Sequence, residues 1–148
     1  MERRNASPGR RAFTITEIIV VVIIIGVLAA VIAPRFLGRV GQSKRAVAAS
    51  NAASLATAMK LFVHDNYMPE PGSSIEILWN RPGDIEESQW KGPYVESYDA
   101  LKDPWGNLYV LVIPGQVNHD FDIMSYGRDG QPGGNDDESR DIVHGQKN

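Results

Sequence analysis

The fold is decided by the stretch RAFTITE, residues 11–17, and by the apolar run IIVVVIIIGVLAAVIA that follows it over residues 18–33. From residue 12 to residue 34 the only ionisable side chain is that of Glu17. A helix of this length rises roughly 35 Å, enough to cross a bilayer core about 30 Å thick. The sequence therefore predicts a membrane-spanning helix over residues 13–34.

A single carboxylate near the start of a membrane helix requires an explanation. An ionised side chain at bilayer depth costs at least about 2.5 kcal/mol, so such a group normally has a partner. The first sixty residues offer no evident internal partner for Glu17. One candidate partner is therefore a group from another copy of the chain. The alternative is that Glu17 reaches the interface or is protonated there. The residues alone leave both alternatives open.

The apolar run differs from a secretory signal peptide, which has a shorter apolar region followed by a small-residue cleavage site. The small residues near its end imitate such a site, but the run continues directly into a helical pattern, which favours its retention. Basic residues flank both ends of the run, so their distribution does not set its orientation.

The composition limits the rest of the chain to one modest domain. The 148 residues carry a net charge of −3, and no basic surface indicates a nucleic-acid partner. There are no cysteines, so no disulfide can stabilise the soluble part. A small domain without disulfides needs another source of stability, and a metal ion is one option.

Beyond Pro34 the apolar residues recur at helical spacing, so we expect one helix from Phe13 to about His64. Its second part, residues 35–66, is amphipathic and is expected to pack on a globular domain. Residues 67–148 read as loops and a small β-sheet. A short helix is expected over residues 75–79, and strands over residues 108–113, 121–126 and 141–143. The predicted fold class is α+β, with the long helix packed on a small antiparallel sheet.

An acidic, glycine-rich loop over residues 125–137 is a candidate calcium site. Calcium takes about six to eight oxygen ligands from carboxylates and backbone carbonyls. The candidate ligands are the side chains of Asp129, Asp136 and Asp137 and the carbonyls of Tyr126 and Gln131. The loop is not an EF-hand, because Arg140 stands where the final Glu would be. From the residues alone, a solvated Asp/Gly turn is the alternative.

Motifs for catalysis are missing from the sequence. Nucleophilic catalysis needs a Ser, Cys or Thr beside an oriented base, whereas His64, His119 and His144 stand in unrelated contexts. No zinc pattern and no phosphate-binding glycine loop is present. The sequence therefore predicts a protein that is not an enzyme.

The RAFTITE stretch with its apolar run resembles the class III signal of type IV pilins and type II secretion pseudopilins. The resemblance implies that a prepilin peptidase cuts between Ala12 and Phe13 and then N-methylates Phe13, so that residues 1–12 are a leader. It also implies that Glu17 pairs with the amino terminus of a neighbouring subunit during filament assembly. One departure is Ala12, because the family usually has Gly before the cut.

Two further motifs resemble the major pseudopilins of type II secretion in particular. They are Asp-Pro-Trp-Gly at residues 103–106, which reads as a structural turn, and the Ser-x-Gly-x-Asp-Gly…Asn-Asp-Asp pattern within residues 125–137. In that family the last loop binds calcium, so the resemblance favours the calcium interpretation. The absence of cysteines agrees, since many type IV pilins close their C-terminal loop with a disulfide.

The resemblance implies a structural subunit of a pseudopilus, a periplasmic filament that drives export of folded proteins across the outer membrane. The expected partners are copies of the chain, the prepilin peptidase, minor pseudopilins, the inner-membrane assembly platform and membrane lipid. The chain would span the inner membrane once, with its N-terminus in the cytoplasm and its C-terminal domain in the periplasm. The alternatives are a type IV pilin or competence pseudopilin that forms a surface fibre, and a membrane-tethered binding module.

Overall fold

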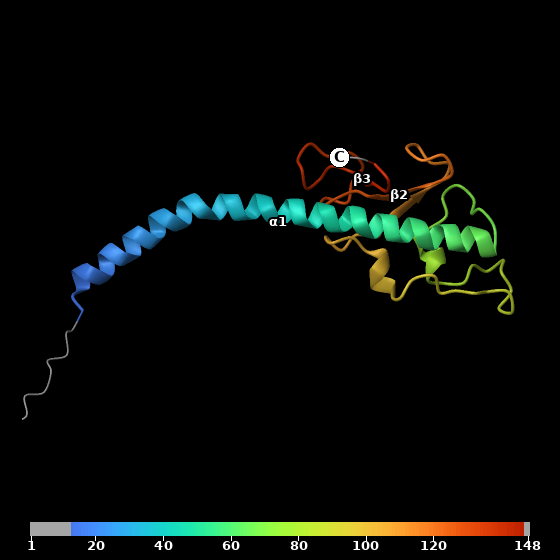
Figure 1. Ribbon diagram of the computed structural model, residues 1–148, viewed down its shortest axis with the longest axis horizontal. Helices are drawn as coiled ribbons and strands as arrows, with labels where there is room; N and C mark the ends of the chain where they lie inside the picture. The colour runs from blue at the N-terminus through green and yellow to red at the C-terminus, as the bar shows by residue number, and fades with distance from the viewer. Residues whose placement is uncertain (1–12, 147–148) are drawn as a thin grey trace, which may run out of the picture. The chain divides into compact units, whose positions relative to one another are not determined.

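The computed structural model describes residues 13–146, and the chain divides into two units, Met1–Gly38 and Arg39–Asn148. The predicted leader, residues 1–12, and with it Ala12, lies outside the described residues. A single helix, α1, runs over Ile15–Asp65, followed by short 3-10 turns and three strands (Figure 1).

The start of α1 is set by Thr14. Its hydroxyl accepts a hydrogen bond from the Glu17 amide at 3.2 Å, and its carbonyl accepts from the same amide at 3.1 Å. This is the N-cap arrangement that satisfies the free N–H groups of a first helical turn. The helix was expected to begin at Phe13, but the capping by Thr14 starts it at Ile15. It ends at Asp65, one residue beyond the expected end.

The first part of α1 is long and apolar enough to cross a membrane. The segment Ile15–Ile32 passes this criterion with none of its residues buried within the protein. Arg39–Asp65 also passes by length and composition, but 39% of it is buried. The second segment therefore serves as the core helix of the domain, whereas the first exposes its apolar side chains.

Residues 39–65 of α1 bury one face against the rest of the domain. The largest side chains on that face are Leu55, Met59 and Phe62, and none of them is more than 3% exposed. They pack on Leu78, Leu101, Tyr109 and Ile123 in one hydrophobic cluster. The Tyr109 hydroxyl donates to the Ala48 carbonyl of α1 at 2.9 Å, which satisfies both buried oxygens.

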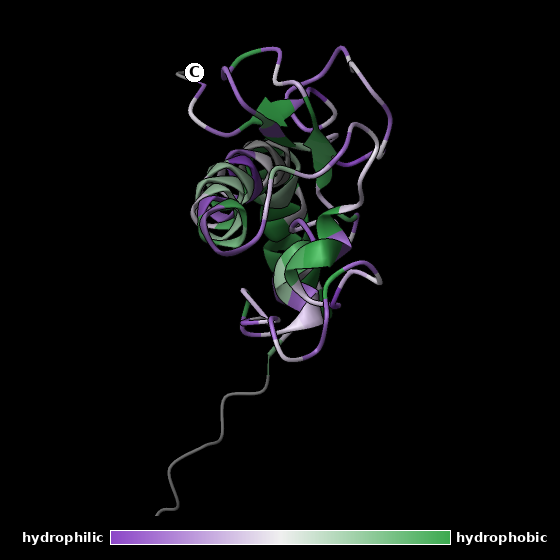
Figure 2. Cartoon of the chain, turned by 90° about the vertical axis from the view of Figure 1, so that its right-hand side faces the viewer, coloured by the Kyte–Doolittle hydropathy of each residue, from purple (hydrophilic) through white to green (hydrophobic). Residues whose placement is uncertain are grey.

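The sheet is antiparallel, with strand order β1-β2-β3. The strands are β1 (Val110–Val112), β2 (Asp122–Ser125) and β3 (Ile142–Val143). Leu111 is paired with Ile123, and Met124 with Val143. Each strand is shorter than expected, because the ladder extends only where a neighbouring strand faces it. Figure 2 shows hydrophobic strand segments near the helix and mostly hydrophilic loops around them.

The predicted helix at residues 75–79 is a 3-10 turn, η1 (Ile75–Leu78). The hydroxyl of Ser74 accepts from the Glu76 amide at 3.2 Å, so Ser74 caps the turn. A second turn, η2 (Tyr98–Leu101), was not expected from the sequence. Ser97 caps it in the same way, by accepting from the Ala100 amide at 3.3 Å.

Asp122 is a buried carboxylate in β2 that organises the loop before it. It accepts from the amides of Gln116, Val117 and Asn118, and from the Asn118 side chain at 2.7 Å. Burial alone would raise the pKa of Asp122, but these hydrogen bonds outweigh it and hold the pKa below its ordinary value. Asp122 therefore stays ionised inside the domain.

His144 connects the C-terminal end of the chain to β2. It is 9% exposed, its ring stacks on Phe121, and its Nδ1 accepts from the Ile123 amide at 2.9 Å. This hydrogen bond requires an unprotonated Nδ1. Burial lowers the pKa of His144 and Lys60 lowers it further, against the opposing effect of Asp122.

The lowered pKa of His144 predicts a loss of stability at mildly acidic pH. Between the ordinary value of 6.5 and the folded pKa, the unfolded chain binds the proton more tightly, so stability is full above this range and falls within it. We expect the melting temperature of the full chain in detergent to drop by roughly 5 °C from about pH 7.5 to about pH 5.

His144→Gln should flatten this pH dependence, because glutamine can accept from the Ile123 amide without titrating. His119→Gln is the matched control, since the His119 side chain is fully exposed. A wild-type pH profile in the His144→Gln variant would contradict the assignment.

Candidate functional site

The beginning of α1 places the predicted assembly residues at the surface. Phe13 is 77% exposed, and Glu17 is exposed in the first turn of the helix. A carboxylate in this position interacts favourably with the helix dipole. No basic residue stands between residues 13 and 32, so this segment supplies no cationic side chain to Glu17.

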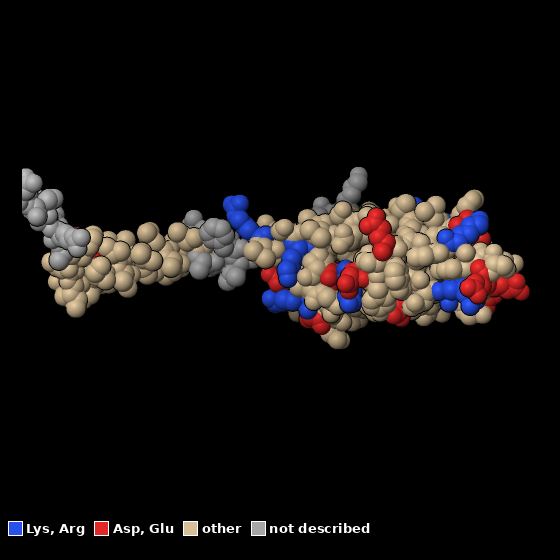
Figure 3. Space-filling model, turned by 90° about the horizontal axis from the view of Figure 1, so that it is seen from below, with Lys and Arg blue, Asp and Glu red and all other residues tan. Residues whose placement is uncertain are grey.

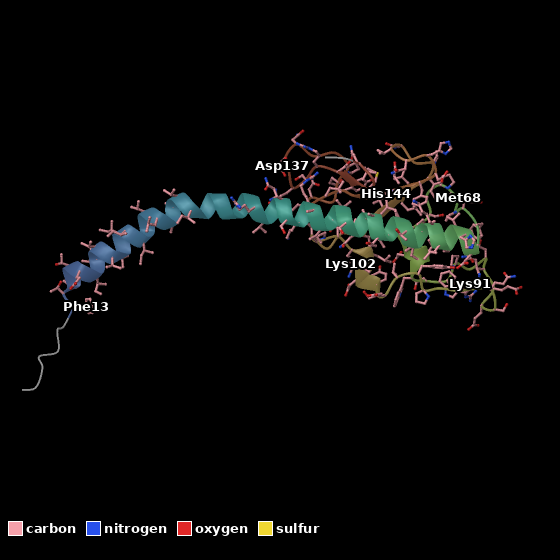
Figure 4. The ribbon with its side chains drawn as sticks, in the orientation of Figure 1. Phe13, Met68, Lys91, Lys102, Asp137 and His144 are labelled. Carbon is pink, nitrogen blue, oxygen red and sulfur yellow. The ribbon has the colours of Figure 1, made fainter. Side chains whose placement is uncertain are left out.

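The charge distribution follows the division of the chain. Figure 3 shows the visible face of the apolar segment almost without charged side chains, whereas both signs of charge are spread over the described residues from 39 to 146. Figure 4 shows Phe13 at the start of the described chain and Asp137 in the C-terminal loop. The predicted assembly residues and the predicted calcium ligands therefore belong to different units.

The loop over residues 125–137 is folded back on the segment that follows it. The Arg128 amide donates to the Glu138 carbonyl at 2.9 Å, and the Asp141 amide donates to the Gly133 carbonyl at 3.2 Å. Gly127 has a φ of 70°, and a Cβ there would collide with the Glu138 carbonyl. Only glycine fits such a position, where the conformation and the space both exclude a side chain.

The three predicted carboxylate ligands are held in different ways. Asp136 accepts from the amides of Glu138 and Ser139 at 2.8 and 2.9 Å and from the Ser139 hydroxyl at 3.0 Å. The Ser139 amide is the main reason why the pKa of Asp136 lies below its ordinary value. Asp129 accepts from the Gln131 amide at 3.2 Å, and Asp137 lies 3.5 Å from the Arg140 guanidinium.

The donor types of this loop suit calcium, because carboxylate and carbonyl oxygens are the ligands that calcium takes. The positions of these donors do not form a metal site, however. Within residues 13–146, no three Asp, Glu or His side chains form a group that could hold a metal ion. The three aspartates instead face loop amides and guanidinium groups. The structure thus brings them into one loop without gathering them around one point.

Arg128 and Glu138 belong to this loop region and were missed by the sequence analysis. Arg128 lies 3.1 Å from the Glu138 carboxylate and 3.6 Å from that of Asp136. In the sequence, Arg128 is an unspecified position within the Ser-x-Gly-x-Asp-Gly pattern. No signal in the pattern pairs it with a residue ten positions away.

The loop region also contacts α1 within the second unit. Gly41 is buried, and a Cβ on it would lie 2.8 Å from Cγ of Glu138. Nearby, the Arg45 side chain donates to the Arg140 carbonyl at 2.7 Å. A glycine inside a helix is unfavourable by about 1 kcal/mol relative to alanine, so the close approach of Glu138 explains its use here.

Comparison with known proteins identifies the family. Residues 35–145 match the family model described as "Type II secretion system (T2SS), protein G". The chain belongs to this family.

Relatives within the protein G family support the same assignment over nearly the whole chain. Type II secretion system core protein G of Pseudomonas aeruginosa is 36% identical over 142 residues, which cover 94% of this chain and 95% of the relative. The protein of the same name from Escherichia coli K12 is 36% identical over 136 residues, covering 90% and 92%.

A solved structure of a major pseudopilin agrees in fold. The crystal structure of the major pseudopilin from the type 2 secretion system of enterohaemorrhagic Escherichia coli aligns with a TM-score of 0.56 at 27% identity. The alignment covers 72% of this chain and 87% of that chain. The predicted α+β fold and the resemblance to major pseudopilins are confirmed.

The contact between Gly41 and Glu138 generates a testable prediction. Helix propensity alone would make Gly41→Ala stabilising by about 1 kcal/mol. We expect the opposite, a melting temperature lower by roughly 5 °C, because the new Cβ displaces the half-buried Glu138 side chain and breaks its ion pair with Arg128. The measurement is thermal unfolding of the full chain in detergent.

Two variants serve as controls for this prediction. Glu138→Ala combined with Gly41→Ala should recover most of the loss, since the colliding atoms are removed. Gly83→Ala should change the melting temperature little, because a Cβ there meets nothing within 4 Å. A Gly41→Ala protein more stable than wild type would refute the contact.

Proposed function

We propose that this chain is a subunit of the type II secretion pseudopilus, the periplasmic filament that drives export of folded proteins across the outer membrane. The observation that carries the proposal is the segment Ile15–Ile32, whose apolar side chains are all exposed. Such a surface is stable in lipid or against other apolar helices. The domain after it folds around its own core, so the apolar segment remains available for assembly.

Assembly begins with removal of the leader. The prepilin peptidase cuts between Ala12 and Phe13 and methylates the nitrogen of Phe13, which leaves a positive charge at the new amino terminus. Glu17 is exposed on a segment without basic side chains. The amino terminus of a neighbouring copy supplies the missing counter-charge and thereby sets the axial register between subunits.

The chain acts by assembly and not by catalysis. His144 accepts a backbone hydrogen bond, and His119 is exposed beside Asp120, so neither lies beside a nucleophile as a catalytic base would. Subunits wait in the inner membrane with the N-terminus in the cytoplasm and the domain in the periplasm. Minor pseudopilins and the inner-membrane assembly platform are the other partners.

Replacing Glu17 tests this mechanism. Glu17→Ala should remove at least about nine-tenths of the oligomers captured by chemical crosslinking in membranes, because the neighbour's amino terminus loses its only acidic partner. Insertion into the membrane should be unchanged, since alanine makes the segment more apolar.

Two measurements guard the interpretation of the Glu17 variant. Intact mass should show that it is still processed to a methylated Phe13, which excludes a defect in cleavage. Glu17→Asp keeps the charge and should retain part of the crosslinked product. Wild-type oligomer levels in a correctly processed Glu17→Ala protein would refute assembly through this residue.

We further propose that the loop over residues 125–137 binds calcium. Asp129, Asp136 and Asp137 would supply carboxylates, and Tyr126 and Gln131 would supply carbonyls; the ion would neutralise the acidic loop and stabilise it. The support is the all-oxygen donor set and the glycine turns that bring these residues into one loop. The exposed ion pairs of Arg128 contribute only about 0–1 kcal/mol to stability, so calcium could replace Arg128 as the partner of the loop carboxylates at little cost.

Chelation tests the calcium proposal. We expect EGTA to lower the melting temperature of the full chain in detergent by roughly 5 °C or more, because a ligand that binds only the folded state stabilises it. Asp129→Asn should abolish most of this response. Asp129 is the better position for this test than Asp136. Asp136 also accepts from the amides of Glu138 and Ser139, so its replacement would destabilise the loop even without calcium.

Glu87→Gln is the matched control, because Glu87 is an exposed acid outside the loop and its loss should leave the response intact. A wild-type protein that unfolds at the same temperature with EGTA and with calcium would leave the loop as a solvated turn.

A further inference from the structure

The first turns of α1 in the second unit carry basic and apolar side chains on one surface. Val40 is 54% exposed and Val47 is 46% exposed, and the half-buried Lys44 lies between them along the helix. Spacings of four and three residues place these side chains on one face. Arg39 and Ser43 are exposed beside that face, because they precede Val47 by two turns and by one turn. Together these residues form the basic–apolar patch.

The Lys44 ammonium lies against an aromatic side chain. It is 6.0 Å from the ring centroid of the half-buried Trp105 in the Asp-Pro-Trp-Gly turn. A cation over the face of an indole ring is a favourable contact. Lysine beside tryptophan is also typical of membrane interfaces, where the ring lies at the level of the headgroups and the long amine reaches the lipid phosphates. The turn therefore extends the patch beyond α1.

The positive charges of the patch have no acidic partner in the described part of the chain. Within it, neither Arg39 nor Lys44 forms an ion pair. Residues 18–64 contain no Asp or Glu, so α1 supplies no carboxylate between its first and last turns. The acidic C-terminal loop contacts α1 along another strip, at Gly41 and Arg45. Arg39 and Lys44 are therefore open to an anion from outside the chain.

The length of the chain keeps the patch near the lipid surface from which the apolar segment emerges. Arg39 follows Ile32, the last residue of that segment, by seven positions. Seven residues span at most about 25 Å even when fully extended, so Arg39 stays close to the headgroups. Residues 65–96, which follow the end of α1, carry seven acidic and two basic side chains. An anionic bilayer thus attracts the beginning of the domain helix and repels the region beyond its end.

We infer that the basic–apolar patch binds the phosphate headgroups of anionic lipids and so holds the domain against the membrane before assembly. The inference rests on the membrane storage of subunits proposed above. Arg39 and Lys44 supply the charges, and Val40 and Val47 enter the apolar part of the interface. Because incorporation into a filament removes the subunit from the bilayer, extraction must break this contact.

A single fluorescent label tests the contact, since the chain has no cysteine of its own. Ser43→Cys places the label on the patch of the full chain, which is reconstituted in nanodiscs with a quencher on a small fraction of the headgroups. The ratio of quenched to unquenched label should rise at least about tenfold from phosphatidylcholine alone to a roughly 7:3 mixture with phosphatidylglycerol, since each basic residue contributes about fivefold. Salt at about 1 M should remove most of the rise. A label at the exposed Ser88, within residues 65–96, should show no rise.

Charge variants decide which residues make the contact. Arg39→Gln combined with Lys44→Gln should remove most of the rise, whereas Arg39→Lys combined with Lys44→Arg keeps both charges and should retain it. Lys60→Gln combined with Lys91→Gln is the matched control. It changes the net charge equally, but Lys60 lies in the last turns of α1 and Lys91 pairs with Asp65 at its end, so the rise should persist.

The outcomes separate this inference from the proposed function. Equal quenching at residue 43 in both lipid compositions, in a chain that inserts and still gives crosslinked oligomers, would overturn the inference alone. Quenching that follows the protein-to-lipid ratio and not the phosphatidylglycerol content would assign the patch to a second copy and would also overturn it. A chain that inserts into neither bilayer would overturn membrane storage and the inference together.

Arg39→Gln alone covers the case in which Lys44→Gln disturbs the turn through its contact with Trp105. The exposed Arg39 makes no ion pair in the described chain, so its replacement should leave the melting temperature unchanged while lowering the ratio about fivefold. A wild-type ratio in this variant would overturn the role of Arg39 and with it the inference.

Discussion

The packing of one face of α1 against the loops and strands is the interaction on which the second unit depends. Leu55, Met59 and Phe62 are buried there among residues from η1, η2 and the sheet. Truncating any one of them would cost about 2–5 kcal/mol, a large part of the stability of a domain of this size. The sheet has only three short strands, so it could not persist without the helix beneath it.

Buried polar groups stabilise the C-terminal region of this cysteine-free chain, where other small domains use disulfides. Asp103, through Ser125, and His144, through Ile123, each join segments more than 20 positions apart, whereas Asp122 holds the loop just before it through backbone amides. Removing one partner of such a group costs about 1–3 kcal/mol, whereas an exposed ion pair contributes about 0–1 kcal/mol. The C-terminal region is therefore held by buried hydrogen bonds more than by its many surface charges.

This arrangement suits a subunit of the protein G family. The domain is completed by its own contacts, so it can fold before assembly. Within the described chain, none of the side chains of Ile15–Ile32 in α1 is buried, and such an apolar surface is stable in lipid or beside other apolar helices. The proposed storage in the membrane and incorporation into a filament would thus use the same exposed surface, and in the proposed assembly the carboxylate of Glu17 would add the directional element that apolar packing lacks.

The sequence by itself determined the apolar segment, the position of Glu17, the long helix and the approximate strands, because these follow from local composition and periodicity. It also located the acidic loop. Strand lengths, η2 and the partners of the loop residues came from the structure. Arg128 with Glu138 and Gly41 with Glu138 are examples, since neither spacing has a local signal.

Only the tertiary structure decided how the polar residues are used. Asp103 and Ser125 stand 22 positions apart, and Tyr109 reaches a carbonyl 61 positions away. Such pairs form because the chain must satisfy every buried donor and acceptor once the apolar faces have packed. Which residues pair is then decided by the packed topology and cannot be predicted from the local sequence pattern.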